Sequence, residues 1–228
     1  MKITCPFHAN GQERTPSLEI YQTGYYCFSC SAKGPLTDLG LTKEPVLVPR
    51  KQENLQEKLT YIAQLPLLPQ RGLTFPTNKE GFYIVWPNKE FYIKRLYTGK
   101  IRYISPSGHK RPPFAYLKNH KLLILVEGEI NAMSLNETGI DADIISPGSA
   151  GEFGSPQFQK YLDKLPKYHK IVILVDDDTP GVIAGIEAKS YLLTKCSQII
   201  LVLMKHDAND YLVKYGKEKL KEYIKSYI

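Results

Sequence analysis

Residues 171–181 have the sequence IVILVDDDTPG, and this stretch decides the fold. Its first five residues are all apolar, without the alternation of a strand that faces water on one side. Such a run is typical of a parallel strand buried on both faces of a sheet. Three aspartates follow directly, and Gly181 permits a tight turn from strand into helix. The stretch therefore predicts a buried strand that delivers carboxylates to the edge of a sheet.

The same pattern recurs on both sides of this stretch. Further apolar runs of strand length lie at 121–126, 142–145 and 199–203. Helical stretches are expected near 131–137, 156–164 and 182–193, and a final amphipathic helix near 208–227 with a possible break at Gly216. Alternating strands and helices predict an α/β core with a mainly parallel sheet flanked by helices.

The chain upstream of this core divides into three further parts. Residues 1–43 are short, rich in turns and cysteine-bearing, and we expect a small β module. Residues 44–58 are polar and contain two prolines, so we expect a linker that runs into a helix near 55–65. Residues 72–120 hold short runs of Tyr, Phe and Ile between Gly, Pro and Asn, which predict antiparallel strands, and we expect residues 59–120 to form a basic α+β subdomain. Residues 121–228 form the α/β core with its C-terminal helix.

Charge is spread unevenly along the 228 residues. The net charge is +7 overall. Residues 44–120 carry thirteen basic and five acidic residues, whereas residues 121–228 carry thirteen basic and fifteen acidic ones. A concentrated basic segment is typical of a partner rich in phosphates, although a solvated basic surface has the same composition. No apolar run is long enough to cross a bilayer and the first residues resemble no signal peptide, so we expect a cytoplasmic protein without a membrane partner.

Acidic residues follow three of the expected parallel strands. They are Glu127 and Glu129, then Asp176 and Asp178, then Asp207 and Asp210. The carboxyl ends of parallel strands meet at one edge of a sheet, so these six side chains are expected in one crevice. Clustered carboxylates are the ligands of Mg²⁺ or Mn²⁺, and two such ions can drive the attack of a 3′-hydroxyl on a triphosphate. The alternative is that single acids only cap helices.

Three of the four cysteines lie in the first 30 residues. Cys5 and His8 form one pair and Cys27 and Cys30 form another, each with two residues between its members. Two such pairs predict two turns that close a tetrahedral zinc site with three sulfur ligands and one nitrogen ligand. A four-ligand site has no open position, so the zinc is expected to be structural. Cys196 stands apart and is expected to be a buried apolar residue.

The expected zinc hairpin also carries aromatic and basic residues. Tyr26, Phe28 and Lys33 lie on it or beside it. Aromatic rings interleaved with cations suit stacking on unpaired bases and pairing with phosphates. Some of these rings are instead expected to pack against the metal site.

Taken together, these motifs resemble the DnaG-type DNA primases of bacteria and phages. The segments CPFH at 5–8, TPSL at 15–18 and YCFSC at 26–30 resemble the zinc finger of that family, with Cys, His, Cys and Cys as ligands. Glu127-Gly128 followed by Asp176, Asp178 and Gly181 resembles the Toprim domain, and DANDYL at 207–212 resembles its third acidic motif. The resemblance covers roughly residues 1–40 and 68–215.

The middle of the chain is similar to the same family in a looser way. Arg71-Gly72 looks like the turn before the primase core, and the strand-borne basic residues look like the ridge that carries template and primer. The residues expected to bind nucleic acid or nucleotide in this block are Arg71, Lys94, Arg95, Arg102, Lys110, Arg111 and Lys118. Seven positive charges in excess between 85 and 120 suit the neutralisation of a duplex backbone.

This sequence departs from the family at two points. Asn131 stands where many members have an aspartate, which weakens one contact to the metal shell or leaves it to Glu129. The chain also ends soon after the Toprim core, without the helicase-interaction domain or fused helicase of other members. We expect a compact phage or mobile-element primase, or a fragment of a primase.

The resemblance implies a zinc-bearing, Mg²⁺- or Mn²⁺-dependent primase. Its expected partners are a single-stranded DNA template, ribonucleoside triphosphates, the RNA–DNA hybrid that forms and a separate replicative helicase. Two other functions remain open from the sequence. One is a non-enzymatic zinc and Toprim recombination mediator, and the other is a Toprim nuclease.

Overall fold

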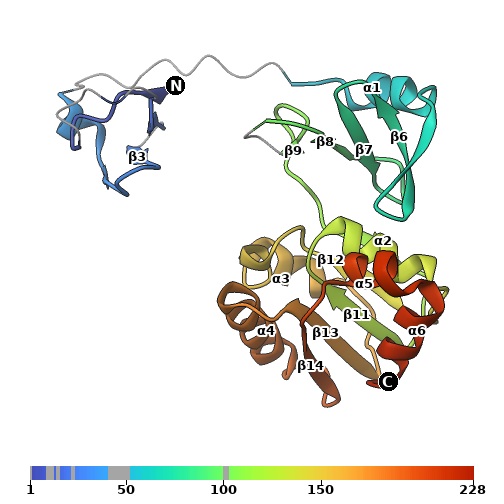
Figure 1. Cartoon of the computed structure of the whole chain (residues 1–228). Helices are drawn as coiled ribbons and strands as arrows, with labels where there is room; N and C mark the ends of the chain where they lie inside the picture. Colours follow the sequence, from blue (N-terminus) through green and yellow to red (C-terminus); the bar gives the residue numbers. More distant parts are fainter. Residues whose placement is uncertain (1, 9–12, 14–15, 22–23, 41–51, 100–102) are drawn as a thin grey trace. The chain divides into compact units, whose positions relative to one another are not determined.

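The computed structural model describes residues 2–8, 13, 16–21, 24–40, 52–99 and 103–228. Contacts divide the chain into two compact units, Met1–Lys51 and Gln52–Ile228. Each unit is described by itself (Figure 1). Most of the expected linker, from 44 to 51, lies outside the described residues.

The first unit is a small antiparallel sheet of four strands in the order β1-β2-β3-β4. Its elements are β1 (Lys2–Ile3), β2 (Leu18–Ile20), β3 (Tyr25–Cys27), β4 (Lys33–Gly34) and the 3₁₀ helix η2 (Leu36–Leu39). Its core is small and includes two of the cysteines beside Leu18, Ile20 and Tyr25. So few apolar residues stabilise a fold weakly on their own, which leaves a role for a metal.

The second unit begins with helix α1 (Leu55–Ala63), which Asn54 caps through its side chain. A five-stranded antiparallel sheet follows in the order β5-β6-β7-β8-β9. Its strands are β5 (Leu67–Gln70), β6 (Leu73–Asn78), β7 (Gly81–Val85), β8 (Tyr92–Leu96) and β9 (Tyr103–Ile104). This is the expected basic α+β subdomain.

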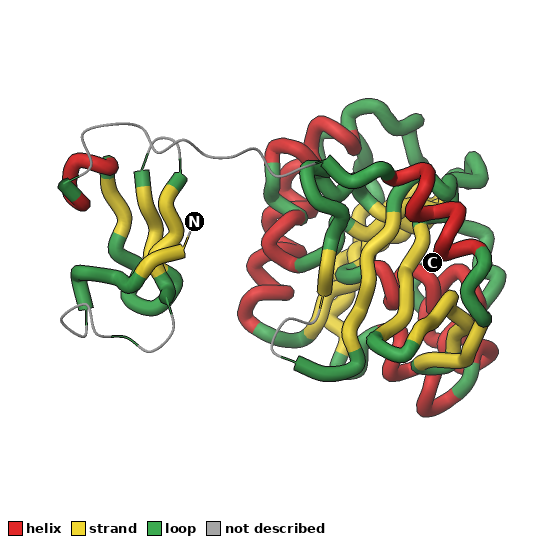
Figure 2. Tube along the Cα trace, turned by 90° about the horizontal axis from the view of Figure 1, so that it is seen from above, coloured by secondary structure: helices red, strands yellow, loops and turns green. Residues whose placement is uncertain are grey.

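The α/β part of the second unit has a five-stranded sheet in the order β10-β12-β11-β13-β14. Strands β11 (Leu122–Val126), β12 (Asp143–Ser146), β13 (Lys170–Asp176) and β14 (Ile199–Met204) pair in parallel, and β10 (Phe114–Tyr116) is antiparallel to β12. The remaining elements are α2 (Glu129–Glu137), η3 (Ala150–Glu152), α3 (Pro156–Leu162), α4 (Thr179–Leu192), α5 (Ala208–Tyr215) and α6 (Lys217–Lys225). Helices flank the strands on both sides (Figure 2).

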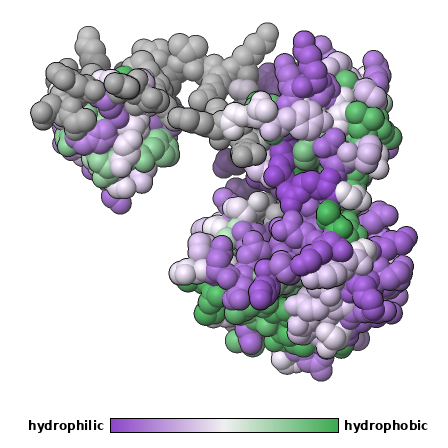
Figure 3. Space-filling view, viewed as in Figure 1, coloured by the Kyte–Doolittle hydropathy of each residue, from purple (hydrophilic) through white to green (hydrophobic). Residues whose placement is uncertain are grey.

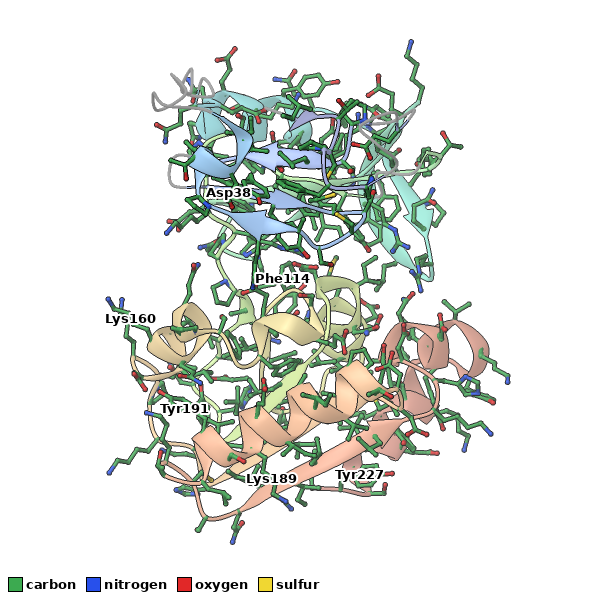
Figure 4. The ribbon with its side chains drawn as sticks, turned by 90° about the vertical axis from the view of Figure 1, so that its left-hand side faces the viewer. Asp38, Phe114, Lys160, Lys189, Tyr191 and Tyr227 are labelled. Carbon is green, nitrogen blue, oxygen red and sulfur yellow. The ribbon has the colours of Figure 1, made fainter. Side chains whose placement is uncertain are left out.

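Alternate residues of β13 supply two different hydrophobic cores. Val172 and Leu174 point into a core shared with α2, α5 and α6, while Ile171, Ile173 and Val175 point into a core shared with α3 and α4. The first core continues into the antiparallel sheet through Phe114, labelled in Figure 4, whose ring lies 5.1 Å from that of Trp86. Helix α4 also presents Ile183 and Ile186 to solvent, and an apolar surface is visible there (Figure 3).

The fold class expected from the sequence is confirmed: an α/β core, a preceding basic α+β subdomain and a small zinc-ribbon-like β module. In the described part of the chain, no helix combines the length and the apolar character that crossing a membrane requires.

Candidate metal centres and nucleotide site

Three parallel strands of the α/β sheet end next to acidic residues. Strand β11 ends one residue before Glu127, β13 ends at Asp176, and β14 ends three residues before Asp207. A helix begins within four residues of each strand end. Because these strands are parallel, their ends lie at one edge of the sheet.

A depression of about 260 Å³ lies at this edge. Its lining consists of Asp176, Asp177, Asp178, Met204, Lys205, His206, Asp207 and Asp210. Glu127 lies within electrostatic reach, since the charges of Asp178 and Asp207 add to burial in raising its pKa. The structure thus groups five of the six predicted acids.

Two of these acids also cap helices. One carboxylate oxygen of Asp178 accepts a hydrogen bond from the Gly181 N–H at 2.7 Å, and one of Asp207 accepts from the Asp210 N–H at 2.7 Å. Gly181 is required at its position, because a β-carbon there would lie 2.3 Å from the Asp176 carbonyl oxygen. Capping occupies one oxygen of each carboxylate, so capping and metal binding do not exclude each other.

The electrostatics of the depression suit a divalent cation. Burial and the charges of Glu127, Asp207, Asp178 and Asp210 raise the pKa of Asp176 to about 6. One oxygen of Glu127 accepts from the Ala150 N–H at 3.1 Å, while the other is buried and has no hydrogen-bond partner among the described residues. Carboxylate oxygens that repel one another and have no hydrogen-bond donor nearby are suitable ligands for Mg²⁺ or Mn²⁺.

Glu129 is placed differently from the other predicted acids. Its side chain is buried, 4% exposed, and forms an ion pair with Arg111. Burial raises the pKa of Glu129, and the Arg111 charge opposes that rise. Glu129 does not line the acidic depression but a neighbouring basic cavity.

This basic cavity has a volume of about 300 Å³. Its lining consists of Arg71, Arg95, Arg111, Tyr103, Gly128, Glu129, Ile130, Asn131, Gly148, Ser149 and Asp207. The first turn of α2 contributes to the wall, and no side chain caps that helix at Gly128. Arginines beside the N-terminus of a helix are suited to bind phosphate. Asp207 lines both this cavity and the acidic depression.

The other predicted basic residues do not line this cavity. Lys94 is buried, 9% exposed, and its ammonium group pairs with Glu80. Lys118 donates a hydrogen bond from Nζ to Asn136 at 3.0 Å, and Lys110 is exposed. Arg102 lies outside the described residues.

The first unit brings its four predicted ligands together. The ligand atoms of Cys5, His8, Cys27 and Cys30 all lie within 4.8 Å of one another. Among the described residues, no other group of three or more His, Cys, Asp or Glu side chains brings its ligand atoms together in this way. The carboxylates of the acidic depression do not converge to that degree, as expected of like charges that repel.

The cysteines of this cluster differ in how readily their thiols lose a proton. Burial and hydrogen bonds with the other two cysteines raise the pKa of Cys5 to about 11. For Cys27 burial acts in the same direction, but a hydrogen bond with Ser17 and those from the backbone N–H groups of Cys30 and Ser29 outweigh it and lower the pKa to about 6. Three sulfurs and an imidazole at this spacing fit a structural zinc ion.

Glu13 is a supporting residue of this site that no sequence pattern indicated. Its carboxylate accepts from the Cys5 N–H at 2.6 Å and from the Ser17 N–H and hydroxyl at 2.9 and 2.6 Å. The ring of His8 lies 3.4 Å away. Lys205 and His206 were also missed, although their position directly before Asp207 at a strand end could have indicated them.

The predicted aromatic residues of the hairpin are partly exposed. The rings of Tyr26 and Phe28 lie 5.1 Å apart in an edge-to-face arrangement, and Phe28 is 58% exposed. Lys33 is exposed on β4 and pairs in register with Tyr26 on β3. These three residues therefore form one patch with aromatic and basic character.

Comparisons with known proteins identify the class of fold. Residues 124–212 match the family described as Toprim-like. The chain thus joins a Toprim-like α/β core to a module with a cysteine and histidine cluster, and the resemblance to DnaG-type primases is confirmed at the level of the fold. No curated protein matches this sequence.

Solved structures then point to particular proteins with this fold. The primase fragment of the bacteriophage T7 primase-helicase protein is 14% identical, with a TM-score of 0.52 and coverage of 98% of both chains. A structure of bacteriophage T7 lagging-strand DNA polymerase interacting with primase domains, bound to an RNA/DNA hybrid and dTTP, contains a chain that is 17% identical. That match has a TM-score of 0.51 and covers 67% of this chain and 81% of the other.

Proposed function

We propose that this protein is a DNA primase that makes short RNA primers on single-stranded DNA. The observation that carries the proposal is the sharing of Asp207 between an acidic depression and a cavity with three arginines. Nucleotidyl transfer needs both elements side by side, carboxylates for divalent ions and cations for the triphosphate.

In this proposal Glu127, Asp176, Asp178 and Asp207 hold the divalent ions, and Asp210 adds to the negative potential that attracts them. When bound, such ions activate the attacking 3′-hydroxyl and stabilise the leaving pyrophosphate. The protein's own contribution is to keep these oxygens at the ends of β11, β13 and β14, on rigid strands of a buried sheet.

The basic cavity holds the triphosphate of the incoming ribonucleotide. Arg71, Arg95 and Arg111 supply guanidinium donors, and the first turn of α2, whose N-cap residue is Gly128, supplies backbone N–H groups. Glu129 acts here by orienting Arg111 through their ion pair. This assignment gives Glu129 a supporting role beside the phosphates.

The remaining predicted contacts are with the nucleic acid. Tyr26, Phe28 and Lys33 of the zinc module stack on and pair with the unpaired template. Lys94, Arg102, Lys110 and Lys118 belong to the surface proposed for the RNA–DNA hybrid, although Lys94 is already engaged by Glu80. The proposal places this reaction in the cytoplasm of a bacterium or of a phage-infected host, with a separate helicase as partner.

The test is synthesis from labelled ribonucleotides on a single-stranded template without a primer. With Mg²⁺ or Mn²⁺ we expect short products. Asp178→Asn should reduce synthesis by about 10³-fold, because it removes a ligand charge. Asparagine caps helices as well as aspartate does, so the N-terminus of α4 should be retained.

Asp177→Asn is the matched control, since it removes the same charge from the same turn. It should retain synthesis within about tenfold, because only a general change in potential is lost. Equal losses in both variants would count against Asp178 as an ion ligand. A chain that makes no product but nicks DNA with metal alone would instead be the nuclease alternative.

A further inference from the structure

Asn131 connects two of the acidic turns directly. It lies in the first turn of α2, where its Nδ2 donates to the Glu127 carbonyl oxygen at 2.8 Å. Its Oδ1 accepts from the backbone N–H of Asn209 at 3.0 Å. Position 131 must therefore donate at one atom and accept at the other. An amide meets both demands, whereas a carboxylate has no hydrogen to donate.

Asn209 extends this connection to a third segment. It is fully buried, and its Nδ2 donates to the Arg71 carbonyl oxygen at 2.9 Å and to the Ser134 hydroxyl at 3.0 Å. The Ser134 hydroxyl uses its own hydrogen to donate to Ile130, so it is free to accept. The carbonyl of Arg71 can only accept, which fixes the orientation of the Asn209 amide.

The network costs stability at two points. The Oδ1 atom of Asn209 is buried without a hydrogen-bond partner among the described residues. Arg71 has a φ of 52°, in the left-handed region that disfavours a side chain. The same Arg71 donates from its guanidinium to Asp210 at 3.2 Å. Buried unpaired groups and strained backbone are tolerated most often where they serve a site.

We infer that Asn131 and Asn209 are positioning residues for the acidic site. They set the spacing between the turn at Glu127 and the turn at Asp207, and through Arg71 they tie both to the wall of the basic cavity. The departure from aspartate at 131 is thus matched to the backbone groups around it. This inference deepens the proposed function, on which its effect on synthesis rests.

The test measures Mn²⁺ binding by the zinc-loaded full chain without nucleotide or DNA, from the electron paramagnetic resonance signal of free Mn²⁺. Asn131→Asp is the decisive variant. It adds a negative charge near the ions, which alone would tighten binding, but it removes the donor to Glu127. We expect affinity for Mn²⁺ to fall by about fivefold, the effect of one lost hydrogen bond.

Asn131→Ala and Asn209→Ala should weaken binding similarly, and the double variant no more than either single one, because they break one network. The matched control is Asn136→Ala, which removes an amide from the same helix whose partner is Lys118. It should leave the affinity unchanged within about twofold. A merely structural role would lower the melting temperature of the first three variants without changing the affinity of the folded chain.

Equal or tighter Mn²⁺ binding by Asn131→Asp overturns the inference, and so does a parent chain that binds no Mn²⁺. Asn131→Asp leaves the buried Asn209 in place, so the test stands if Asn209→Ala does not fold. A chain that shows the expected loss of affinity but makes no primers retains the inference and refutes the proposed function.

Discussion

The zinc module and the acidic edge of the α/β sheet both gather side chains of the kinds that can bind metal ions, but they do so by opposite means. In the module, two short turns bring four ligand atoms within 4.8 Å of one another. At the sheet edge, carboxylates from residues up to 83 positions apart in the chain are assembled by strand topology. Local sequence makes the first site and the whole fold makes the second.

Energetics follow from this difference. The module has a core of few residues that includes two of the ligands, so fold and metal depend on each other. The sheet edge rests on two extensive cores and keeps its geometry while its carboxylates repel. We therefore expect the zinc module to need its metal in order to fold. The sheet edge should fold without a metal and bind one afterwards.

Removal of zinc is the strongest test of this contrast. Structural zinc sites contribute roughly 10–16 kcal/mol of apparent binding free energy, more than so small a core supplies. Cys27→Ala, or a strong chelator, should unfold the first unit and leave the second folded. Amide NMR spectra of the full chain should lose the dispersed signals of the four-stranded sheet of the first unit and keep those of the two sheets of the second.

Cys196→Ala is the control for this experiment, because it removes a buried cysteine from the second unit. It should leave zinc content unchanged. If the signals of the first unit stay dispersed without zinc, the module folds by its own core and the contrast fails.

A smaller effect is expected from the repulsion at the sheet edge. The folded-state pKa of Asp176 is raised to about 6 from an ordinary value of 3.8. The folded chain therefore holds this proton more tightly than the unfolded chain, and stability is lost as pH rises from about 4 through about 6. After allowance for partial exposure the loss is about 1–2 kcal/mol.

Asp176→Asn isolates this contribution. In urea denaturation of the second unit without Mg²⁺ or Mn²⁺, the variant should exceed the parent in stability by about that 1–2 kcal/mol at pH 7.5 and by much less at pH 4. Saturating Mg²⁺ should restore the stability of the parent at pH 7.5, since the ion binds the ionised carboxylate of Asp176. An advantage of the same size at both pH values would show that packing, and not charge, separates the two proteins.

The sequence predicts most of the α/β sheet because its strands are long apolar runs. The run at 171–175 lies within β13 and the run at 199–203 within β14. The expected break at Gly216 is also confirmed, since this residue has a φ of 84° and separates α5 from α6. Apolar runs and glycines determine structure locally, so the elements that they specify can be predicted from the sequence without knowledge of the fold.

The partners of individual side chains cannot be predicted from the sequence in the same way. Glu129 follows Gly128 as an acid of the first motif, but its direction is decided by Arg111, 18 residues earlier in the chain. Lys94 belongs to a basic block by sequence, yet its charge is paired with Glu80, which lies in the turn before the neighbouring strand β7. The network of Asn131 and Asn209 joins residues 78 positions apart. Such pairings exist only after the sheet has formed.

The smallest effect is expected at Glu13, a residue of the zinc module whose side-chain partners the sequence did not predict. Its carboxylate accepts hydrogen bonds from Cys5 and Ser17, and these lower the pKa of Glu13. Glu13→Gln keeps the shape but weakens these acceptors, so the turn that carries Cys5 should open more often. Zinc transfer to a chromogenic chelator should accelerate by about threefold to tenfold, with zinc stoichiometry unchanged.

Glu19→Gln provides the comparison, because it neutralises a carboxylate on β2 that pairs in register with Tyr26 and not with a ligand turn. Its rate of zinc release should equal that of the parent. If both variants release zinc faster by the same factor, the effect comes from the lost charge, and the hydrogen bonds of Glu13 do not hold the ligand turn. If Glu13→Gln alone is faster, even this locally encoded site depends on a side chain that no ligand spacing reveals.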